Sequence, residues 1–249
     1  MSVAGAGSAE DIHGPGSVAL PARIRRFREQ YRDLRIPGYY SGVFHLGFTS
    51  VASVAVVVFS ILQLHSVTAL EWLTIPATFL YANLAEYLGH RGPMHHPAGF
   101  LRLIYERHTL QHHRFFTDEA MQFDSSRDFH AVLFPPVLMV FFITAFALPV
   151  WALLVWLFSA NVAYLFVATA IGYFLNYELL HFAYHTAPDS WVSRLPGMQV
   201  LRQLHTRHHD PALMQRYNFN ITYPICDALF GTLYRHNSGG AGASVEDRG

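Results

Sequence analysis

The segment that decides the fold is residues 151–185, WALLVWLFSANVAYLFVATAIGYFLNYELLHFAYH. Residues 151–180 contain one formal charge, Glu178. As a helix they are more than long enough to cross a hydrocarbon core about 30 Å thick. The segment ends on His181 and His185, which are four residues apart and therefore share one face of a helix. We predict a membrane-spanning helix that continues beyond the membrane and carries a histidine pair.

Three further apolar runs precede this segment. Residues 41–64 carry no formal charge, and residues 131–150 form a similar run. Residues 67–89 form a weaker candidate, because Glu71 and Glu86 lie near its ends and Pro76 can kink it. Short connections near His65–Ser66 and Pro149 join the runs in pairs. The sequence therefore predicts an all-α integral membrane protein with about four transmembrane helices in two hairpins.

The composition agrees with a chain whose solvent is partly lipid. Hydrophobic residues make up 52% and charged residues 14%, whereas an ordinary soluble domain is about 25% charged. The net charge is zero with histidine neutral, so nothing indicates nucleic acid as a partner. The single cysteine, Cys226, excludes an intrachain disulfide.

Outside the apolar runs, the chain divides into a membrane-embedded domain and three flanking segments. Residues 1–20 and 237–249 are rich in glycine, serine and alanine and are predicted to be disordered tails. Residues 21–36 contain six arginines, with apolar residues at helical spacing. This pattern predicts an amphipathic helix on the membrane surface, with a solvated helix as the alternative. The membrane-embedded domain is residues 37–236.

The arginines also predict the topology of the chain. A segment so rich in arginine before the first span is expected to stay in the cytoplasm. Four spans then return the chain to the cytoplasm after the second span and after the fourth. Those are the places where most of the histidines lie, so we expect one cytoplasmic helical cap to carry these histidines.

The sixteen histidines concentrate in two blocks, residues 90–113 and 181–209. The blocks contain the motifs HRGPMH (90–95), HTLQHH (108–113), HFAYH (181–185) and HTRHH (205–209). Histidines three or four residues apart share one helix face, and an adjacent histidine reaches a second point nearby. Ten positions follow from the motifs: His90, His95, His108, His112, His113, His181, His185, His205, His208 and His209.

Ten imidazoles are too many for one metal ion and predict two. Imidazole suits zinc, copper, iron or nickel. Few carboxylates lie near the motifs, which argues against the Glu-rich di-iron bundle. We expect hydrogen-bond partners of the rings among polar residues near them in sequence, namely Glu86, Glu106, Glu178, Asp210, Asn218 and Asp227.

Two other classes of metal protein are open. A structural zinc site commonly uses four ligands that include cysteine. A metal transporter would place its ligands in the middle of the membrane, whereas these motifs lie at the ends of spans. This position disfavours transport. A membrane metal-binding or transport protein is the alternative to an enzyme.

The four motifs together resemble the fatty acid hydroxylase/sterol desaturase superfamily, which comprises integral-membrane non-haem di-iron oxygenases. The segment YNFNITYPICDALFGTLY (217–234) is similar to the end of that family's domain. The resemblance covers residues 40–235. It implies that the ten histidines bind two iron ions, that O₂ is a co-substrate, and that a C–H bond of a membrane lipid is hydroxylated.

The resemblance also implies partners and leaves alternatives. Electrons would come from a separate donor, such as cytochrome b5 or a ferredoxin with a reductase. The protein would lie in a bacterial plasma membrane, or in the endoplasmic reticulum of a eukaryote. A desaturase or a carotenoid or sterol ring hydroxylase would use the same centre. His96 duplicates the end of the first motif, so either His95 or His96 could be the ligand, and three residues between His108 and His112 depart from the spacing of many members.

Overall fold

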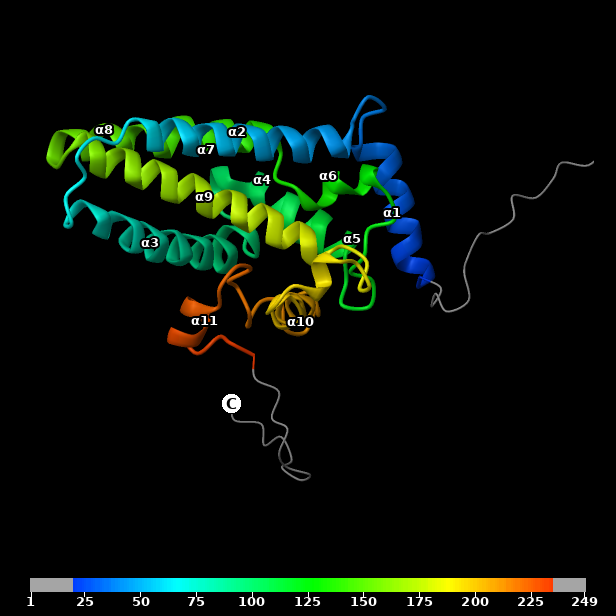
Figure 1. Ribbon diagram of the computed structural model, residues 1–249. Coiled ribbons are helices and arrows are strands. Elements are labelled where there is room, and N and C mark those ends of the chain that lie inside the picture. The colour runs from blue at the N-terminus through cyan, green and yellow to red at the C-terminus, as the bar shows by residue number, and fades with distance from the viewer. Residues whose placement is uncertain (1–19, 235–249) are drawn as a thin grey trace, which may run out of the picture.

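The computed structural model describes residues 20–234, and every regular element in this range is a helix (Figure 1). This confirms the predicted all-α class. The predicted tails at 1–20 and 237–249 lie outside the described residues, apart from Leu20.

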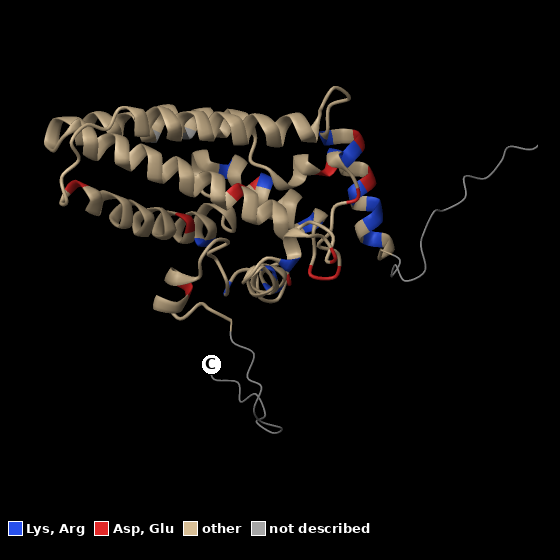
Figure 2. Ribbon diagram, in the orientation of Figure 1, with Lys and Arg blue, Asp and Glu red and all other residues tan. Residues whose placement is uncertain are grey.

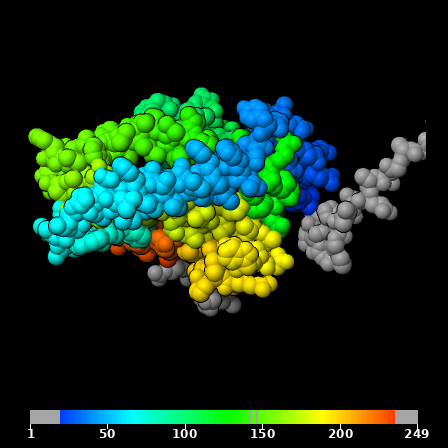
Figure 3. Space-filling view, turned by 45° about the horizontal axis from the view of Figure 1, so that its top comes forward, coloured from blue at the N-terminus to red at the C-terminus, as the bar shows by residue number. Residues whose placement is uncertain are grey.

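One long helix, α9 (Ala160–Tyr184), is the central element of the apolar bundle. It packs against α2 (Gly42–Leu62), α3 (Thr74–Gly89) and α8 (Leu148–Leu157). Figure 1 shows α9 running between α2 and α3, and Figure 3 shows α2 lying across one outer face of the bundle. Because α9 contacts each of the other three, its two ends define the two ends of the bundle.

Helix α2 is polar on its inner side and apolar on its outer side. Thr49, Ser53 and Ser60 are buried, whereas Val51 and Val58 are exposed. In water this arrangement would be unfavourable, because large apolar side chains would face the solvent. In lipid it is favourable, because small polar side chains let helices approach closely while the large ones contact acyl chains.

Three stretches of the described chain are long and apolar enough to cross a membrane: Gly42–Leu62, Ser126–Leu157 and Ala160–Tyr184. The predicted span 67–89 is shorter than expected. It forms a single 3₁₀ turn, Glu71–Leu73, and then α3, which has 16 residues. At about 1.5 Å per residue, α3 falls short of a hydrocarbon core of about 30 Å.

The predicted connection near Pro149 was wrong. Pro149 lies inside a continuous helical stretch, directly after the π-helical turn Ile143–Ala147, so the chain does not turn there. The chain turns instead at Phe158 and Ser159, and the Ser159 hydroxyl caps α9 by accepting a hydrogen bond from the Val162 N–H. Ser159, at an N-cap position in the sequence, was the signal that could have located this turn.

The connection near His65–Ser66 is present, and a polar network fixes it to the start of α9. The Asn161 amide donates to the His65 carbonyl at 2.8 Å and accepts from the His65 N–H at 3.0 Å. The Glu71 carboxylate accepts from the Ser159 hydroxyl. These bonds close the bundle at the end opposite the histidines.

Most of the remaining helices are short and gather around the other end of α9, which carries His181 and His185 (Figure 1). The remaining elements are the π-helical turn His90–Met94, the 3₁₀ turn Gly99–Leu101, α4 (Arg102–Tyr105), the π-helical turn Glu106–His112, α5 (His113–Phe115), the 3₁₀ turn Ser126–Asp128, α6 (Phe129–Val132), α7 (Pro136–Phe142) with the π-helical turn Ile143–Ala147, the 3₁₀ turn Val192–Arg194, α10 (Met198–His208) and α11 (Ile225–Leu229). Of these, α7 and the turn Ile143–Ala147 belong to the long apolar stretch that leads into α8.

The arginine-rich segment forms helix α1 (Ala22–Arg35), close to the predicted range 21–36. Figure 2 shows that charged residues concentrate on α1 and around the histidine end, whereas most of the bundle carries none. One side of α1 is buried: Ile24, Arg28 and Tyr31 face the rest of the protein. The helix therefore packs onto the cap through this side, and its other side is exposed.

The start of α2 depends on a close approach that only glycine permits. A Cβ atom at Gly42 would overlap the Ser126 carbonyl oxygen and the Phe129 ring. We expect Gly42→Ala to lower the free energy of unfolding by about 1–3 kcal/mol, as overpacking does elsewhere. Thermal unfolding of the detergent-solubilised protein measures the change. Gly47→Ala on the same helix is the control, because nothing lies within 4 Å of its Cβ, and equal loss in both variants would contradict the expectation.

Candidate metal centre

The ten predicted histidines lie in two adjacent groups, each formed by five rings that offer one nitrogen apiece within 4.8 Å of the others. The first histidine group is His90, His95, His108, His113 and His208. The second histidine group is His112, His181, His185, His205 and His209. All ten side chains are buried.

The adjacent histidines divide between the groups. His112 belongs to the second group and His113 to the first, and His208 and His209 divide in the same manner. Successive residues of a helix point about 100° apart, so one short helix supplies rings to two neighbouring points. The π-helical turns His90–Met94 and Glu106–His112 bring the rings of residues 90–113 to the same place as those at the ends of α9 and α10.

His95, rather than His96, lies in the first group. His95 is buried, and its Nε2 is 3.0 Å from Nε2 of His208. His96 is exposed, because the π-helical turn ends at Met94 and the chain then leaves the site. His108 also lies in the first group despite its unusual spacing, with its Nε2 2.9 Å from Nε2 of His90.

Within each group the rings point their Nε2 atoms toward one another. In the first group, Nε2 of His113 is 3.0 Å from Nε2 of His108. In the second, Nε2 of His112 is 3.2 Å from that of His209 and 3.1 Å from that of His181. Nε2 of His205 is likewise 3.1 Å from Nε2 of both His185 and His209. Each group therefore directs a ring of nitrogens at one point.

The other ring nitrogen, Nδ1, contacts a backbone carbonyl in five of the ten histidines. The Nδ1–O distances are 2.9 Å from His112 to Ala131, 2.7 Å from His185 to Met121, 3.0 Å from His208 to Tyr217 and 2.8 Å from His209 to Phe116, and His90 contacts Phe219 in the same way. A carbonyl oxygen only accepts hydrogen bonds, so Nδ1 of each of these rings carries the proton. In a neutral ring Nε2 then carries a lone pair.

This arrangement fits a bound cation. The Nε2 atoms of His112 and His209 face each other at 3.2 Å, and each Nδ1 is committed to a carbonyl. Two facing lone pairs repel unless a positive charge lies between them. Burial lowers the pKa of His112 to about 3 and holds that of His209 well below its usual range, so a proton does not supply that charge at neutral pH. A metal ion does, and neutral imidazole is its ordinary ligand form.

The predicted side-chain hydrogen-bond partners of the rings were wrong. Among the described residues, no carboxylate or Asn side chain from the predicted set has a hydrogen bond to a ring of either group. Glu106 instead pairs with Arg102. Asp210 accepts from the Ala212 N–H, and Asn218 donates to the Leu204 carbonyl. Backbone carbonyls orient the rings, and the sequence carries no signal for them.

Two of the predicted carboxylates bind backbone near a histidine ring and not the ring itself. Asp227 accepts hydrogen bonds from the N–H groups of Phe219 and Asn220 at 3.0 and 2.7 Å. Glu86 accepts from the N–H groups of Ile221 and Thr222. Both therefore fix the segment whose Phe219 carbonyl contacts His90. Glu178 accepts from the Phe134 N–H at 3.1 Å and lies three residues before His181.

One side chain that was not predicted does contact a ring. The Thr109 hydroxyl donates to the Met94 carbonyl at 2.6 Å and lies 3.3 Å from Nδ1 of His95. Thr109 follows His108 directly, inside the second motif. A hydroxyl beside a histidine motif is a weak signal in sequence, and only the π-helical turn brings it to His95.

The model of the fatty acid hydroxylase family matches residues 75–232, well over half of the chain and all ten histidines. The chain belongs to the fatty acid hydroxylase family. Membership indicates an oxidoreductase that hydroxylates lipids. The family generally depends on iron. Together with the three apolar helices, it indicates an integral membrane protein. The resemblance drawn from the four motifs is thereby confirmed.

A solved structure also shares the fold. It is that of full-length Scs7p, in which only the hydroxylase domain is visible. The likeness has a TM-score of 0.56 at 20% sequence identity and covers 78% of this chain and 68% of that one. At this identity it shows a common fold. Among curated proteins, none matches this sequence significantly.

The placement of His95 and His96 gives a direct test of the first group. We expect His95→Ala to reduce the metal content of the purified protein, because it removes one of five converging nitrogens. His96→Ala is a matched control from the adjacent position and should leave the metal content unchanged. Elemental analysis of both variants by mass spectrometry measures it. A loss in His96→Ala equal to that in His95→Ala would contradict the assignment.

Proposed function

We propose that this protein hydroxylates a C–H bond of a membrane lipid, with O₂ as co-substrate, at two iron ions held by the two histidine groups. The observation that carries the proposal is an apolar cavity of about 430 Å³ that adjoins the first group. Its lining includes His90 of the first group, Gly89 and Ala85 on α3, and Ala170 and Phe174 on α9. This volume falls in the range of small-molecule sites, about 300–1,000 Å³.

A second cavity shares lining residues with the first and is lined by histidines of both groups. This smaller cavity, of about 30 Å³, is lined by His108 of the first group and by His112 and His181 of the second. Ile104, Phe134 and Tyr177 line both cavities. A lipid chain in the larger cavity would therefore lie beside residues that also line the smaller cavity at the two groups.

The walls of the cavity suit an acyl or similar apolar chain. The helices that form it, α3, α9 and the segment leading into α8, have apolar outer faces. A lipid can thus enter sideways from the bilayer without crossing water. The apolar walls exclude water from the reacting carbon, and the helix backbones on either side orient it.

Iron bound by the ten rings would supply the redox chemistry that activates O₂. The protein itself holds five of these rings in one tautomer through the carbonyls of Phe116, Met121, Ala131, Tyr217 and Phe219. It also keeps the rings dry, since all ten are buried. The electrons would come from a separate donor, such as cytochrome b5 or a ferredoxin with its reductase.

The orientation in the membrane is part of the proposal. The arginines of α1 lie at the histidine end of the bundle (Figure 2). Arginine accumulates on the cytoplasmic side, which supports a site on the cytoplasmic face of a bacterial plasma membrane, or of the endoplasmic reticulum in a eukaryote. Both histidine groups lie at one end of the bundle rather than along it, which disfavours metal transport.

The first test compares the lipids of cells that express the intact protein with those of cells that express His208→Ala/His209→Ala. The double variant removes one ring from each group, so we expect it to be inactive. A lipid that gains one oxygen only with the intact protein is the expected result in mass spectrometry. A lipid that loses two hydrogens would make the protein a desaturase. No change, with an electron donor supplied, would contradict the proposal and favour metal binding alone.

The cavity makes a second prediction. Ala170→Phe should fill part of the cavity and lower the yield of the oxidised lipid, while the metal content stays the same because no histidine moves. Ala55→Phe is the control: it adds the same bulk to the exposed face of α2. Product yield and metal content are measured on the same preparations. Normal yield from Ala170→Phe would show that the cavity is not the substrate site.

A further inference from the structure

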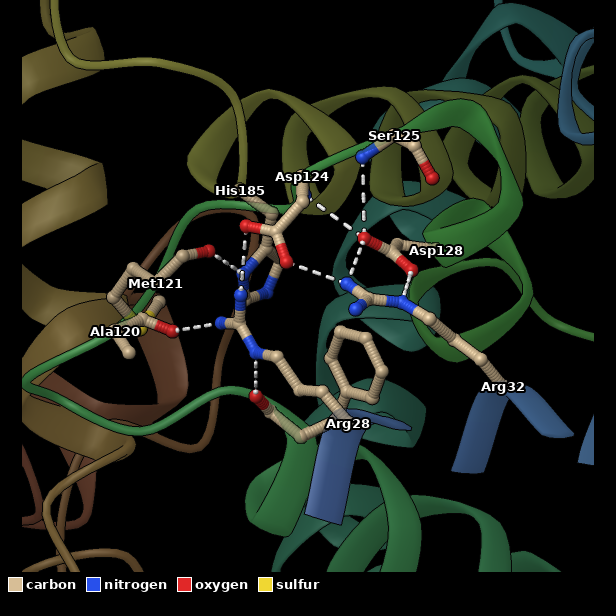
Figure 4. Close-up of polar contacts among 9 residues, drawn as sticks. Arg28, Arg32, Ala120, Met121, Asp124, Ser125, Asp128 and His185 are labelled. Atoms are coloured by element: carbon tan, nitrogen blue, oxygen red, sulfur yellow. Dashed lines mark hydrogen bonds and ion pairs between the residues drawn. The ribbon is translucent and has the colours of Figure 1, made fainter. Parts of the chain in front are cut away.

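Arg28 is a buried arginine far from the family domain in sequence. It lies on α1, outside the matched residues 75–232, and it is 1% exposed. Its guanidinium bridges two points of one loop. Nε donates to the Phe115 carbonyl at 2.9 Å and Nη2 to the Ala120 carbonyl at 2.7 Å (Figure 4).

The two carbonyls that Arg28 holds stand directly before two that orient histidines. Phe116 follows Phe115, and its carbonyl accepts from Nδ1 of His209 at 2.8 Å. Met121 follows Ala120, and its carbonyl accepts from Nδ1 of His185 at 2.7 Å (Figure 4). Arg28 thus fixes the backbone at both ends of the loop that sets the orientation of two rings of the second histidine group.

The charge of Arg28 is balanced where it lies. Nη1 is 3.2 Å from Asp124, and the guanidinium lies over the rings of Phe115 and Phe116, 4.9 and 5.4 Å from their centres. Arg32 of the same helix binds Asp124 and Asp128 (Figure 4). A buried cation is retained only with such partners. The planar guanidinium matters as well, because the single ammonium group of a lysine does not reach both carbonyls.

We propose that Arg28 is a positioning residue of the second histidine group: it holds the 115–121 loop so that His185 and His209 direct their Nε2 atoms at the ion. The inference rests on the proposed function for the presence of an ion. It assigns to α1 a role in the metal centre in addition to any contact with the membrane surface.

The first histidine group has a separate support, which supplies the control. His208 and His90 are oriented by the carbonyls of Tyr217 and Phe219, and Asp227 holds that segment through the N–H groups of Phe219 and Asn220. Arg28 has no contact with residues 217–220 among the described interactions. The two supports should therefore act on different ions.

The experiment uses the full chain with only one group left intact. His90→Ala/His95→Ala disables the first group, and His181→Ala/His205→Ala disables the second. Arg28→Ala, Arg28→Lys and Asp227→Ala are placed in each background, and the Kd for Zn²⁺ is measured by competition with a chelating dye. Zinc serves as the probe because imidazole binds it and it undergoes no redox change.

Arg28→Ala should raise the Kd of the second group by about 10–100-fold, the usual effect of losing an outer partner, and leave the first group unchanged. Arg28→Lys should give a smaller rise, and Asp227→Ala the opposite selectivity. Arg26→Ala, from an exposed position on the same helix, should change neither. Helix content, measured by circular dichroism, shows whether each variant is folded. If Arg28→Ala does not fold, Arg28→Lys is used for the test.

Two failures are distinguishable. If Arg28→Ala weakens both groups equally, or neither, the positioning role is wrong even though two ions bind. If the intact chain does not bind two zinc ions, or if either background alone binds none, the two-metal centre itself is wrong. The number of imidazoles around zinc, measured by X-ray absorption, provides a readout that does not depend on activity.

Discussion

Electrostatic repulsion between nitrogen lone pairs is the constraint on which the site depends. Five rings have Nδ1 bonded to backbone carbonyls, so their Nε2 lone pairs point inward. Burial removes water that could separate the nitrogens, and it also disfavours protonation. The folded chain therefore assembles two points of negative potential that a cation stabilises.

The long helices place the apolar cavity relative to the histidines. Helix α9 connects the apolar bundle to the histidine end, and it contributes both to the apolar cavity and to the second histidine group through His181. One helix therefore sets the distance between the apolar cavity and the second histidine group. The polar network of Glu71, Ser159 and Asn161 fixes the opposite end of that helix. The position of the second histidine group relative to the apolar bundle is thus determined by contacts at both ends of α9.

Much of the fold and of the candidate site could be predicted from the sequence, because apolar runs and histidine spacing are both strong patterns. Long apolar runs predicted the helical class, and repeated histidine spacing predicted ten positions that the fold brings together in two groups. The turn at Phe158–Ser159 was missed because a capping serine inside an apolar run is a weak signal beside Pro149. His95 and His96 could not be separated by spacing, since the π-helical turn that selects His95 has no signature in sequence. The role of Arg28 was also out of reach, because its partners are main-chain atoms about 90 residues away in sequence.

The carbonyl contacts of the rings have a consequence for how such a site changes over evolutionary time. A carbonyl oxygen is present at every residue, so Phe116, Met121, Ala131, Tyr217 and Phe219 can be replaced without losing the acceptor that each offers to its histidine. Selection at these positions then acts on the path of the backbone and not on the side chain. Two chains can diverge until few residues are shared and still orient the same rings, provided that the loops keep their shape.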